Sequence, residues 1–70
     1  MVEKTILLTG TSPNGITEAI ELAIARATVT IEGIHRARVK DVRMTIESGA
    51  ITTWTVDVEV TFEVKEDVHG

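Results

Sequence analysis

The sequence contains no cysteine, and its two histidines, His35 and His69, lie far apart in the chain. The absence of cysteine excludes disulfide bonds and thiolate zinc ligands, and two distant histidines are too few for a structural zinc site. The 70 residues are expected to form one domain, residues 1–70. A domain of this size buries only about 60% of its unfolded surface. Since neither disulfides nor zinc stabilise it, we expect oligomerisation to do so.

Long apolar runs and excess positive charge are also missing. No stretch approaches the ~18 consecutive apolar residues of a membrane span. The start of the chain, Met1 to Lys4, lacks the basic and apolar regions of a signal peptide. We therefore expect a soluble, cytoplasmic protein with no membrane partner. The 11 acidic and 7 basic residues give a formal net charge of -4, which repels a phosphate backbone, so no nucleic acid partner is expected.

The beginning of the chain has the pattern of a strand followed by a helix. Residues 2–9 alternate between polar and apolar and then run apolar, which predicts a short strand that ends at Gly10. Ser12 before Pro13 resembles a helix N-cap with proline in the first helical position. A helix should therefore start between Ser12 and Gly15.

The predicted helix carries its apolar residues along one side. They fall at steps of three and four residues, at Ile16, Ile20, Ala23, Ile24, Ala27 and Ile31. The β-branched residues 28–31 favour a helix only weakly, and Gly33 has the position of a left-handed C-terminal cap. We therefore expect the helix to end near Ile31.

Residues 34–64 have the pattern of one long antiparallel hairpin. Within residues 51–64 the even positions from 54 onward are apolar and the odd positions from 55 onward are polar, which is the period of a half-buried strand. The apolar positions are Trp54, Val56, Val58, Val60, Phe62 and Val64. In the other strand the apolar positions change from odd to even between Val39 and Val42. A β-bulge at Lys40 and Asp41 would keep all its apolar side chains on the core face.

The register of the hairpin depends on the length of its turn. We expect a three-residue loop, residues 48–50, in which Gly49 has a positive φ. This loop sets Met44 opposite Trp54, so that apolar residues face each other. A two-residue loop would instead set Arg43 opposite Trp54, and a slip of one residue would turn the apolar face outward.

These predictions describe an α+β fold of order β-α-β-β, in which a three-stranded antiparallel sheet is partly wrapped around one helix. A helix of about 16 residues is ~24 Å long, whereas strands of about 14 residues reach ~46 Å. The sheet should therefore extend beyond its helix, and its apolar face needs another cover. Neighbouring copies of the same chain would supply that cover.

The order and spacing of three segments make the chain resemble the dodecin family. The segments are residues 8–12 (Leu-Thr-Gly-Thr-Ser) after a strand, residues 23–27 (Ala-Ile-Ala-Arg-Ala) in the helix, and residues 58–64 (Val-Glu-Val-Thr-Phe-Glu-Val) in the hairpin. The resemblance covers nearly all 70 residues. It implies a hollow homododecamer that binds and stores flavins such as riboflavin, FMN or FAD and does not catalyse a reaction.

The same resemblance implies where a flavin would bind. Typical members stack the flavin ring on a tryptophan near the start of the second strand and hydrogen-bond it with a glutamine early in the third. These positions carry Arg36 and Thr55 here. A guanidinium replaces only part of an aromatic stacking surface, and threonine is too short to reach where a glutamine amide would. Trp54 lies on the opposite face of the strand from Thr55 and is expected to pack against Met44.

Other polar residues leave alternatives open. Arg36 and Arg38, repeated by symmetry, would bind an anion such as a nucleotide phosphate. The expected register also sets Arg38 opposite Glu59, so a cross-strand ion pair competes with that interpretation. Asp41 and Asp57 should lie near each other across the bulge, where carboxylates from further copies would complete a calcium site.

No arrangement of residues predicts catalysis. The chain lacks a cysteine nucleophile, His35 has no sequence partner that would orient it, and Ser12 is interpreted as a helix cap. Three functions remain open. They are a flavin-binding or storage protein, a divergent dodecin that holds another small anion or a metal ion, and a purely structural assembly module.

Overall fold

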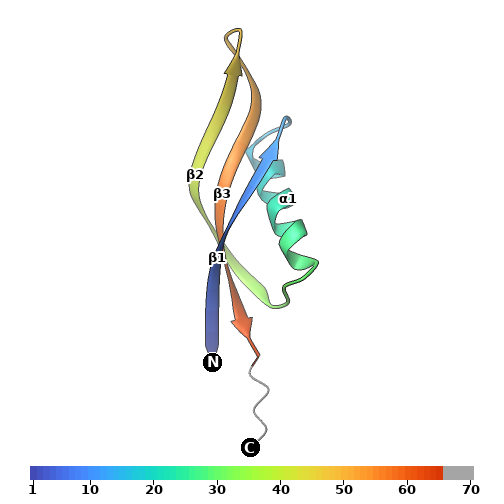
Figure 1. The fold of residues 1–70 in the computed structure, drawn as a ribbon, viewed down its shortest axis with the longest axis vertical. Coiled ribbons are helices and arrows are strands. Elements are labelled where there is room, and N and C mark those ends of the chain that lie inside the picture. The colour runs from blue at the N-terminus through green and yellow to red at the C-terminus, as the bar shows by residue number, and fades with distance from the viewer. Residues whose placement is uncertain (66–70) are drawn as a thin grey trace, which may run out of the picture.

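The computed structural model describes residues 1–65 and has the element order β-α-β-β (Figure 1). The elements are β1 (Val2–Ser12), α1 (Ile16–Thr28), β2 (Ile34–Glu47) and β3 (Ala50–Val64). The three strands form one antiparallel sheet in the order β1-β3-β2, so β3 is central and β1 and β2 are the edges. The predicted α+β fold and its three-stranded sheet are confirmed.

β1 continues through Gly10, and the prediction that this glycine ends the strand is wrong. β1 pairs with β3 as far as Ser12, which lies opposite Trp54. A methyl group at Gly10 would overlap the carbonyl oxygen of Ala19 and lie 3.0 Å from the Ala23 Cβ. The glycine therefore marks a close contact between the strand and α1 rather than a turn.

The helix begins at Ile16, with Gly15 as its N-cap and no side-chain capping hydrogen bond. The predicted roles of Ser12 as the N-cap and Pro13 as the first helical residue are therefore wrong. Ser12 is the buried last residue of β1, and its Oγ accepts a hydrogen bond from the backbone N–H of Asn14 at 3.0 Å. The hydroxyl stabilises the turn between strand and helix instead of the end of the helix.

The helix ends at Thr28, before the predicted end near Ile31. The backbone N–H groups of Val29 and Thr30 bond to carbonyl oxygens three residues earlier, at distances of 3.3 and 3.2 Å, so the chain tightens where β-branched residues follow one another. Gly33 does have a positive φ, 80°, but it precedes β2 and does not cap α1. Gly33 is therefore part of the segment that connects α1 to the hairpin.

The core lies between α1 and the middle of the sheet. Ala19, Ala23 and Ala27 repeat every four residues along the buried side of α1. Ala19 packs with the fully buried side chains of β3, which are Val56, Val58 and Val60. The predicted apolar side named Ile16 and omitted Ala19, but Ile16 is 41% exposed. Small side chains face the sheet because the backbone of α1 lies so close to Gly10.

The hairpin has the predicted bulge but a different turn. The register shifts between Val39 and Asp41, so Lys40 is the extra residue, as predicted. Ser48 and Gly49 alone form the turn, with φ values of 51° and 79°. Two positive φ values are typical of the two-residue turns that match the twist of a hairpin, and the predicted three-residue loop is wrong.

A second register shift, between Thr45 and Ile46, compensates for the shorter turn. It leaves Thr52 as an extra residue in β3, and the hydroxyl of Thr52 bonds to the carbonyl oxygen of Thr45 at 3.3 Å and to the Glu47 carboxylate at 3.2 Å. On the side of this second bulge that is farther from the turn, Met44 lies opposite Trp54. The predicted register is therefore confirmed, although the predicted loop length is not.

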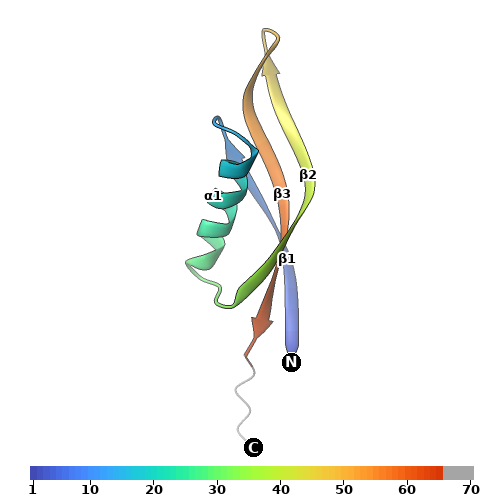
Figure 2. The same ribbon diagram turned by 180° about the vertical axis from the view of Figure 1, so that it is seen from behind.

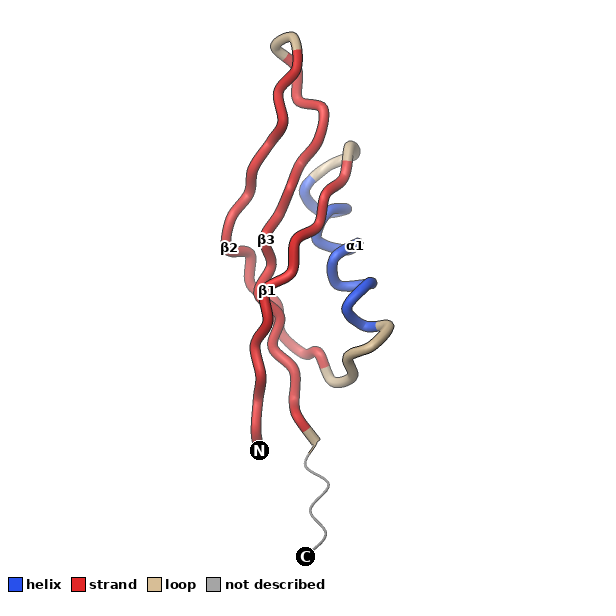
Figure 3. Tube along the Cα trace, viewed as in Figure 1, coloured by secondary structure: helices blue, strands red, loops and turns tan. Residues whose placement is uncertain are grey.

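The sheet extends far beyond the helix (Figures 1 and 2). α1 has 13 residues and β3 has 15, which correspond to lengths of about 20 and 50 Å. The helix packs against β1 and β3 and leaves most of β2 uncovered, and the turn end of the hairpin stands beyond it (Figure 3). Within the described residues, this helix is also too short to cross a membrane.

Apolar side chains of the hairpin consequently stay exposed. Val39, Met44, Ile46 and Ile51 are between 43% and 57% exposed. The register sets the first three opposite apolar residues of β3, on the helix side of the sheet. Trp54 is only half-buried, because the helix does not reach the pair that it forms with Met44. A single copy of the chain therefore has an incomplete core.

We expect Gly10→Ala to destabilise the protein by about 1 to 3 kcal/mol or more, since the added methyl group overlaps the backbone of Ala19 and α1 must shift to make room. Thermal unfolding followed by circular dichroism would measure the change. Thr11→Ala, at an exposed neighbouring position of β1, is the control and should stay within about 0.5 kcal/mol of the unmodified chain. Equal melting temperatures for the two variants would show that α1 does not lie this close to β1.

Candidate functional site

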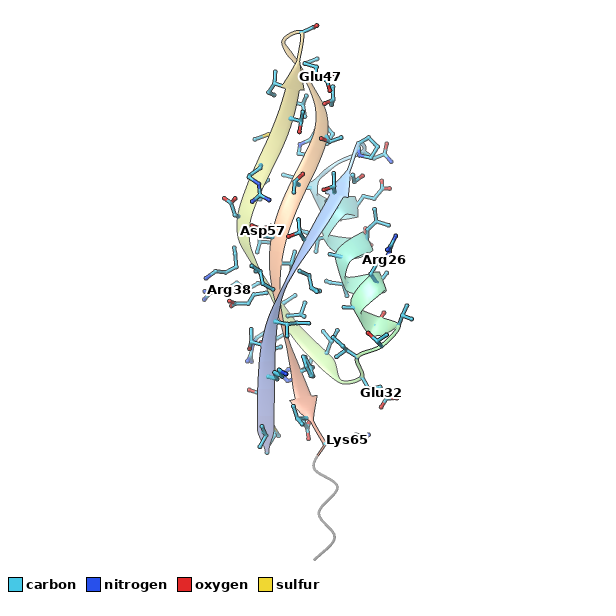
Figure 4. All side chains as sticks on the ribbon, viewed as in Figure 1. Arg26, Glu32, Arg38, Glu47, Asp57 and Lys65 are labelled. Carbon is cyan, nitrogen blue, oxygen red and sulfur yellow. The ribbon has the colours of Figure 1, made fainter. Side chains whose placement is uncertain are left out.

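All the predicted site residues lie on the face of the sheet that is turned away from α1, which we call the outer face. Because side chains alternate along a strand, these residues lie on the other face of the sheet from the buried valines of β3. The register sets them in four rows, each with one residue from β1, β3 and β2. The rows are Thr5, Thr61 and Arg36; Leu7, Glu59 and Arg38; Thr9, Asp57 and Asp41; and Thr11, Thr55 and Arg43. Figure 4 shows Arg38 on the side of the hairpin away from α1.

Arg36 and Arg38 border an open pocket of about 450 Å³ on the outer face. Both arginine side chains are largely exposed, at 63% and 70%. Their ion pairs are loose, because Arg36 Nη2 lies 3.6 Å from Glu3 Oε1 and Arg38 Nε lies 3.9 Å from Glu59 Oε1. The predicted pairing of Arg38 with Glu59 is thus present. Exposed pairs at such distances contribute little stability, so both guanidinium groups remain accessible to an anion.

Hydroxyl groups line the same pocket beside the arginines. Thr5 Oγ1 and Thr61 Oγ1 are 3.0 Å apart, and Thr61 is almost completely buried. Each hydroxyl has one hydrogen to donate and two lone pairs, so the pair keeps hydrogen-bonding capacity for a ligand. Next to Arg36, His35 is exposed, and its Nε2 lies 2.8 Å from Glu3 Oε2.

Thr55 lies far from Arg36 along the outer face. Thr55 is in the row of Thr11, with 3.2 Å between their Oγ1 atoms, whereas Arg36 is in the row of Thr61. Six residue steps of β3 separate Thr55 from Thr61, a distance of about 20 Å. One chain therefore does not bring the two family positions together, and a small ligand would contact both only between two chains. Trp54 is on the helix side of the sheet, as predicted, and so does not lie beside Arg36 or Thr55 on the outer face.

Asp41 and Asp57 are direct partners in the register, so the proximity expected from the bulge is present. Arg43 lies between them. Its Nη1 donates to Asp41 Oδ2 at 2.6 Å and to Asp57 Oδ2 at 2.8 Å, and its Nη2 donates to Asp57 Oδ1 at 3.2 Å. Thr9 Oγ1 donates to Asp57 Oδ1 at 2.9 Å, so the network joins β1, β3 and β2.

The network favours the charged forms of its members. Hydrogen bonds from Arg43 and then from Thr9 hold the pKa of Asp57 below its usual range, and the two carboxylates raise the pKa of Arg43. In residues 1–65, no three Asp, Glu or His side chains gather around one metal position. His69, the second of the two histidines judged too few for a structural zinc site, lies outside the described residues.

Arg43 and Thr9 are members of this cluster that were not predicted, although the sequence contains the signal for Arg43. Asp41 and Arg43 are two residues apart in β2, so alternation puts them on one face, and the bulge at Lys40 turns that face outward, beside Asp57. The register of β1 then adds Thr9 beside Asp57. Adding Thr9 to the cluster required the pairing of β1 with β3, which the sequence pattern alone did not provide.

Both the sequence and the fold of this chain match known proteins. The sequence model of the Dodecin family matches residues 2–65. A Dodecin from Thermus thermophilus is 37% identical over 65 residues, which cover 93% of this chain and 94% of that protein. A crystal structure of an arginine-to-alanine variant of T. thermophilus dodecin has a TM-score of 0.89 and 35% identity, with 93% of this chain and 97% of that chain covered.

A crystal structure of a calcium dodecin from Mycobacterium tuberculosis is also similar. It is described as a calcium-chelating antigen with a novel calcium-binding site. Its TM-score is 0.81 at 33% identity, and 97% of each chain is covered. The agreement in sequence and fold extends over nearly the whole length of these proteins, and it confirms the resemblance in the strand, helix and hairpin segments: the chain belongs to the dodecin family.

Proposed function

We propose that this chain assembles into a hollow homododecamer that binds and stores a small ligand of the flavin class without catalysing a reaction. The near full-length match to the Dodecin family carries the proposal. The proposed ligand-binding residues are Arg36, Arg38 and Thr55, within a single domain of residues 1–70. The bound ligand would be riboflavin, FMN or FAD.

The uncovered side of the hairpin supports assembly. Val39, Met44 and Ile46 expose large apolar surfaces on the helix side of β2, where no other described element covers them. Exposed apolar surface of this kind is removed from water when another protein surface covers it. The edge strands β1 and β2 also have free backbone groups along one side, which further copies would cover or pair with.

The separation of the two family positions supports a ligand site between copies. Arg36 and Thr55 lie in different rows of the outer face, about 20 Å apart along the strands. A flavin ring system is too short to contact both in one chain. The proposed site therefore combines Arg36 from one copy with Thr55 from another, and ligand binding then depends on assembly.

A second candidate function is the binding of a small phosphate-bearing anion at Arg36 and Arg38. The observation that favours it is their shared pocket, in which both guanidinium groups are exposed and only loosely paired with carboxylates. A guanidinium binds phosphate through two parallel hydrogen bonds, which neither Glu3 nor Glu59 makes with these arginines.

The assembly proposal predicts a compact oligomer with a mass near twelve times the 7.6 kDa of the chain. Native mass spectrometry at micromolar protein concentration would measure it, and chiefly monomer or dimer would contradict it. Ile46→Glu should then reduce the oligomer population, because Ile46 is 57% exposed in one chain but would be covered in the assembly. Thr45→Glu, the adjacent exposed position on the opposite face of β2, is the matched control and should leave the mass unchanged.

For the flavin site we expect weak binding of riboflavin by the unmodified chain, since Arg36 lacks an aromatic surface. Restoring the family pattern with Arg36→Trp and Thr55→Gln should tighten binding about 10- to 100-fold, since ring stacking contributes roughly 1 kcal/mol for each favourable pair and symmetry repeats the ring. Quenching of flavin fluorescence during titration would measure both affinities. Arg38→Trp with Thr55→Gln places the same two side chains on the same strands and is the control. Equal gains in both double variants would contradict the assignment of Arg36.

If Arg36 and Arg38 bind phosphate, the unmodified chain should bind FMN more tightly than riboflavin, and the difference should shrink as salt concentration rises. The same fluorescence titration would measure the ratio. Arg38→Gln should reduce the preference for FMN, because it removes one of the two guanidinium groups from the pocket. Equal affinities of the unmodified chain for the two flavins at low salt would exclude a phosphate site at these arginines.

A further inference from the structure

The arginines of the outer face fall into two groups. Arg36 and Arg38 are largely exposed and approach one carboxylate each at 3.6 and 3.9 Å. Arg43 makes three hydrogen bonds of 2.6, 2.8 and 3.2 Å to two carboxylates, and two of these bonds go to the same carboxylate, Asp57. Asp57 is also the least exposed of the paired acidic side chains, at 21%. Arg43 is therefore held in one place, whereas the other two are not.

The strand register creates the need for a cation at this point. Asp41 and Asp57 are direct partners across β2 and β3, and like charges directly opposite each other destabilise a sheet. The nearest basic residue in sequence, Lys40, is the extra residue of the bulge and has no register partner. The guanidinium of Arg43 is within hydrogen-bond distance of both carboxylates and neutralises their repulsion.

The oxygen atoms around the guanidinium are of the kinds that bind a hard cation. They come from the carboxylates of Asp41 and Asp57, with the hydroxyl of Thr9 bonded to the latter at 2.9 Å. Carboxylate oxygens are also the preferred ligands of calcium. The position between the two aspartates is already taken by a positive group that belongs to the chain itself.

We propose that Arg43 is a built-in counter-ion for Asp41 and Asp57, and that it makes this part of the outer face independent of divalent cations. The inference does not rest on the proposed flavin function, because it concerns the row of Thr9, Asp57 and Asp41 and not Arg36 or Thr55. The cation that joins β2 and β3 at the bulge is then a guanidinium and not a metal ion.

The experiment compares melting temperatures of the assembled protein in EDTA and in millimolar calcium chloride, at one fixed protein concentration. We expect calcium to leave the melting temperature of the unmodified chain unchanged. Arg43→Gln should lower the melting temperature in EDTA by about 3 to 8 °C, because two carboxylates then face each other without a cation. Calcium should restore part of that loss in Arg43→Gln, since the metal binds where the guanidinium was.

Combining Arg43→Gln with Asp57→Asn separates neutralisation from simple hydrogen bonding. If Arg43 acts as a counter-ion, removing one of the two facing charges should make the double variant more stable in EDTA than Arg43→Gln alone, and insensitive to calcium. If Arg43 only donated hydrogen bonds, the second substitution would bring no recovery. Arg38→Gln is the matched control, because it makes the same change in net charge opposite a single carboxylate, and its melting temperature should move by less than about 3 °C.

Two results would overturn the proposal. One is a rise in melting temperature with calcium that is as large for the unmodified chain as for Arg43→Gln. The other is a double variant that is no more stable than Arg43→Gln. Should Arg43→Gln fail to fold, folding of the double variant would support the proposal, and failure of both would count against it.

Discussion

A helix advances about 1.5 Å per residue and a strand about 3.3 Å, so a helix and a strand of similar residue number differ more than twofold in length. The 13 residues of α1 therefore cover only part of the 15 residues of β3, and they leave β2 largely uncovered. The buried core is correspondingly small and centred on Ala19 and the three valines of β3. This mismatch leaves the apolar surface around Met44 exposed, and it is the physical reason why we propose that further copies cover it.

The long periodic features were predictable because each depends on many residues. Alternation through residues 51–64 identified the inward side of β3, and the change of parity after Val39 identified the bulge at Lys40. Even the wrong loop length did not disturb the register, since pairing apolar with apolar residues is a stronger constraint than the turn. The extra residue Thr52 absorbed the difference.

The ends of elements were predicted less well because they depend on single residues with more than one structural role. Ser12 has the side chain of an N-cap, but it bonds to Asn14 inside a turn while its backbone remains in β1. The pattern predicted that Gly10 ends the strand, whereas this glycine allows α1 to approach the strand at Ala19. A glycine serves both roles through the same missing side chain, and only the position of the helix distinguishes them.

The candidate site shows the same division between pattern and pairing. The predicted alternation and bulge put Arg36, Thr55, Asp41 and Asp57 on one face, and the confirmed register of β2 with β3 fixes the distance between Arg36 and Thr55. The position of Thr9 beside Asp57 follows only from the pairing of β1 with β3, which the sequence did not predict. The register of β2 with β3 also separates Arg36 and Arg38, which are loosely paired, from Arg43, which is fixed by two carboxylates. Side chains that already satisfy two carboxylates have little capacity left for a ligand, whereas exposed guanidinium groups beside hydroxyls keep theirs. The outer face therefore combines a fixed cation at Arg43, which joins the strands, with accessible cations at Arg36 and Arg38, where an anionic ligand meets the least competition.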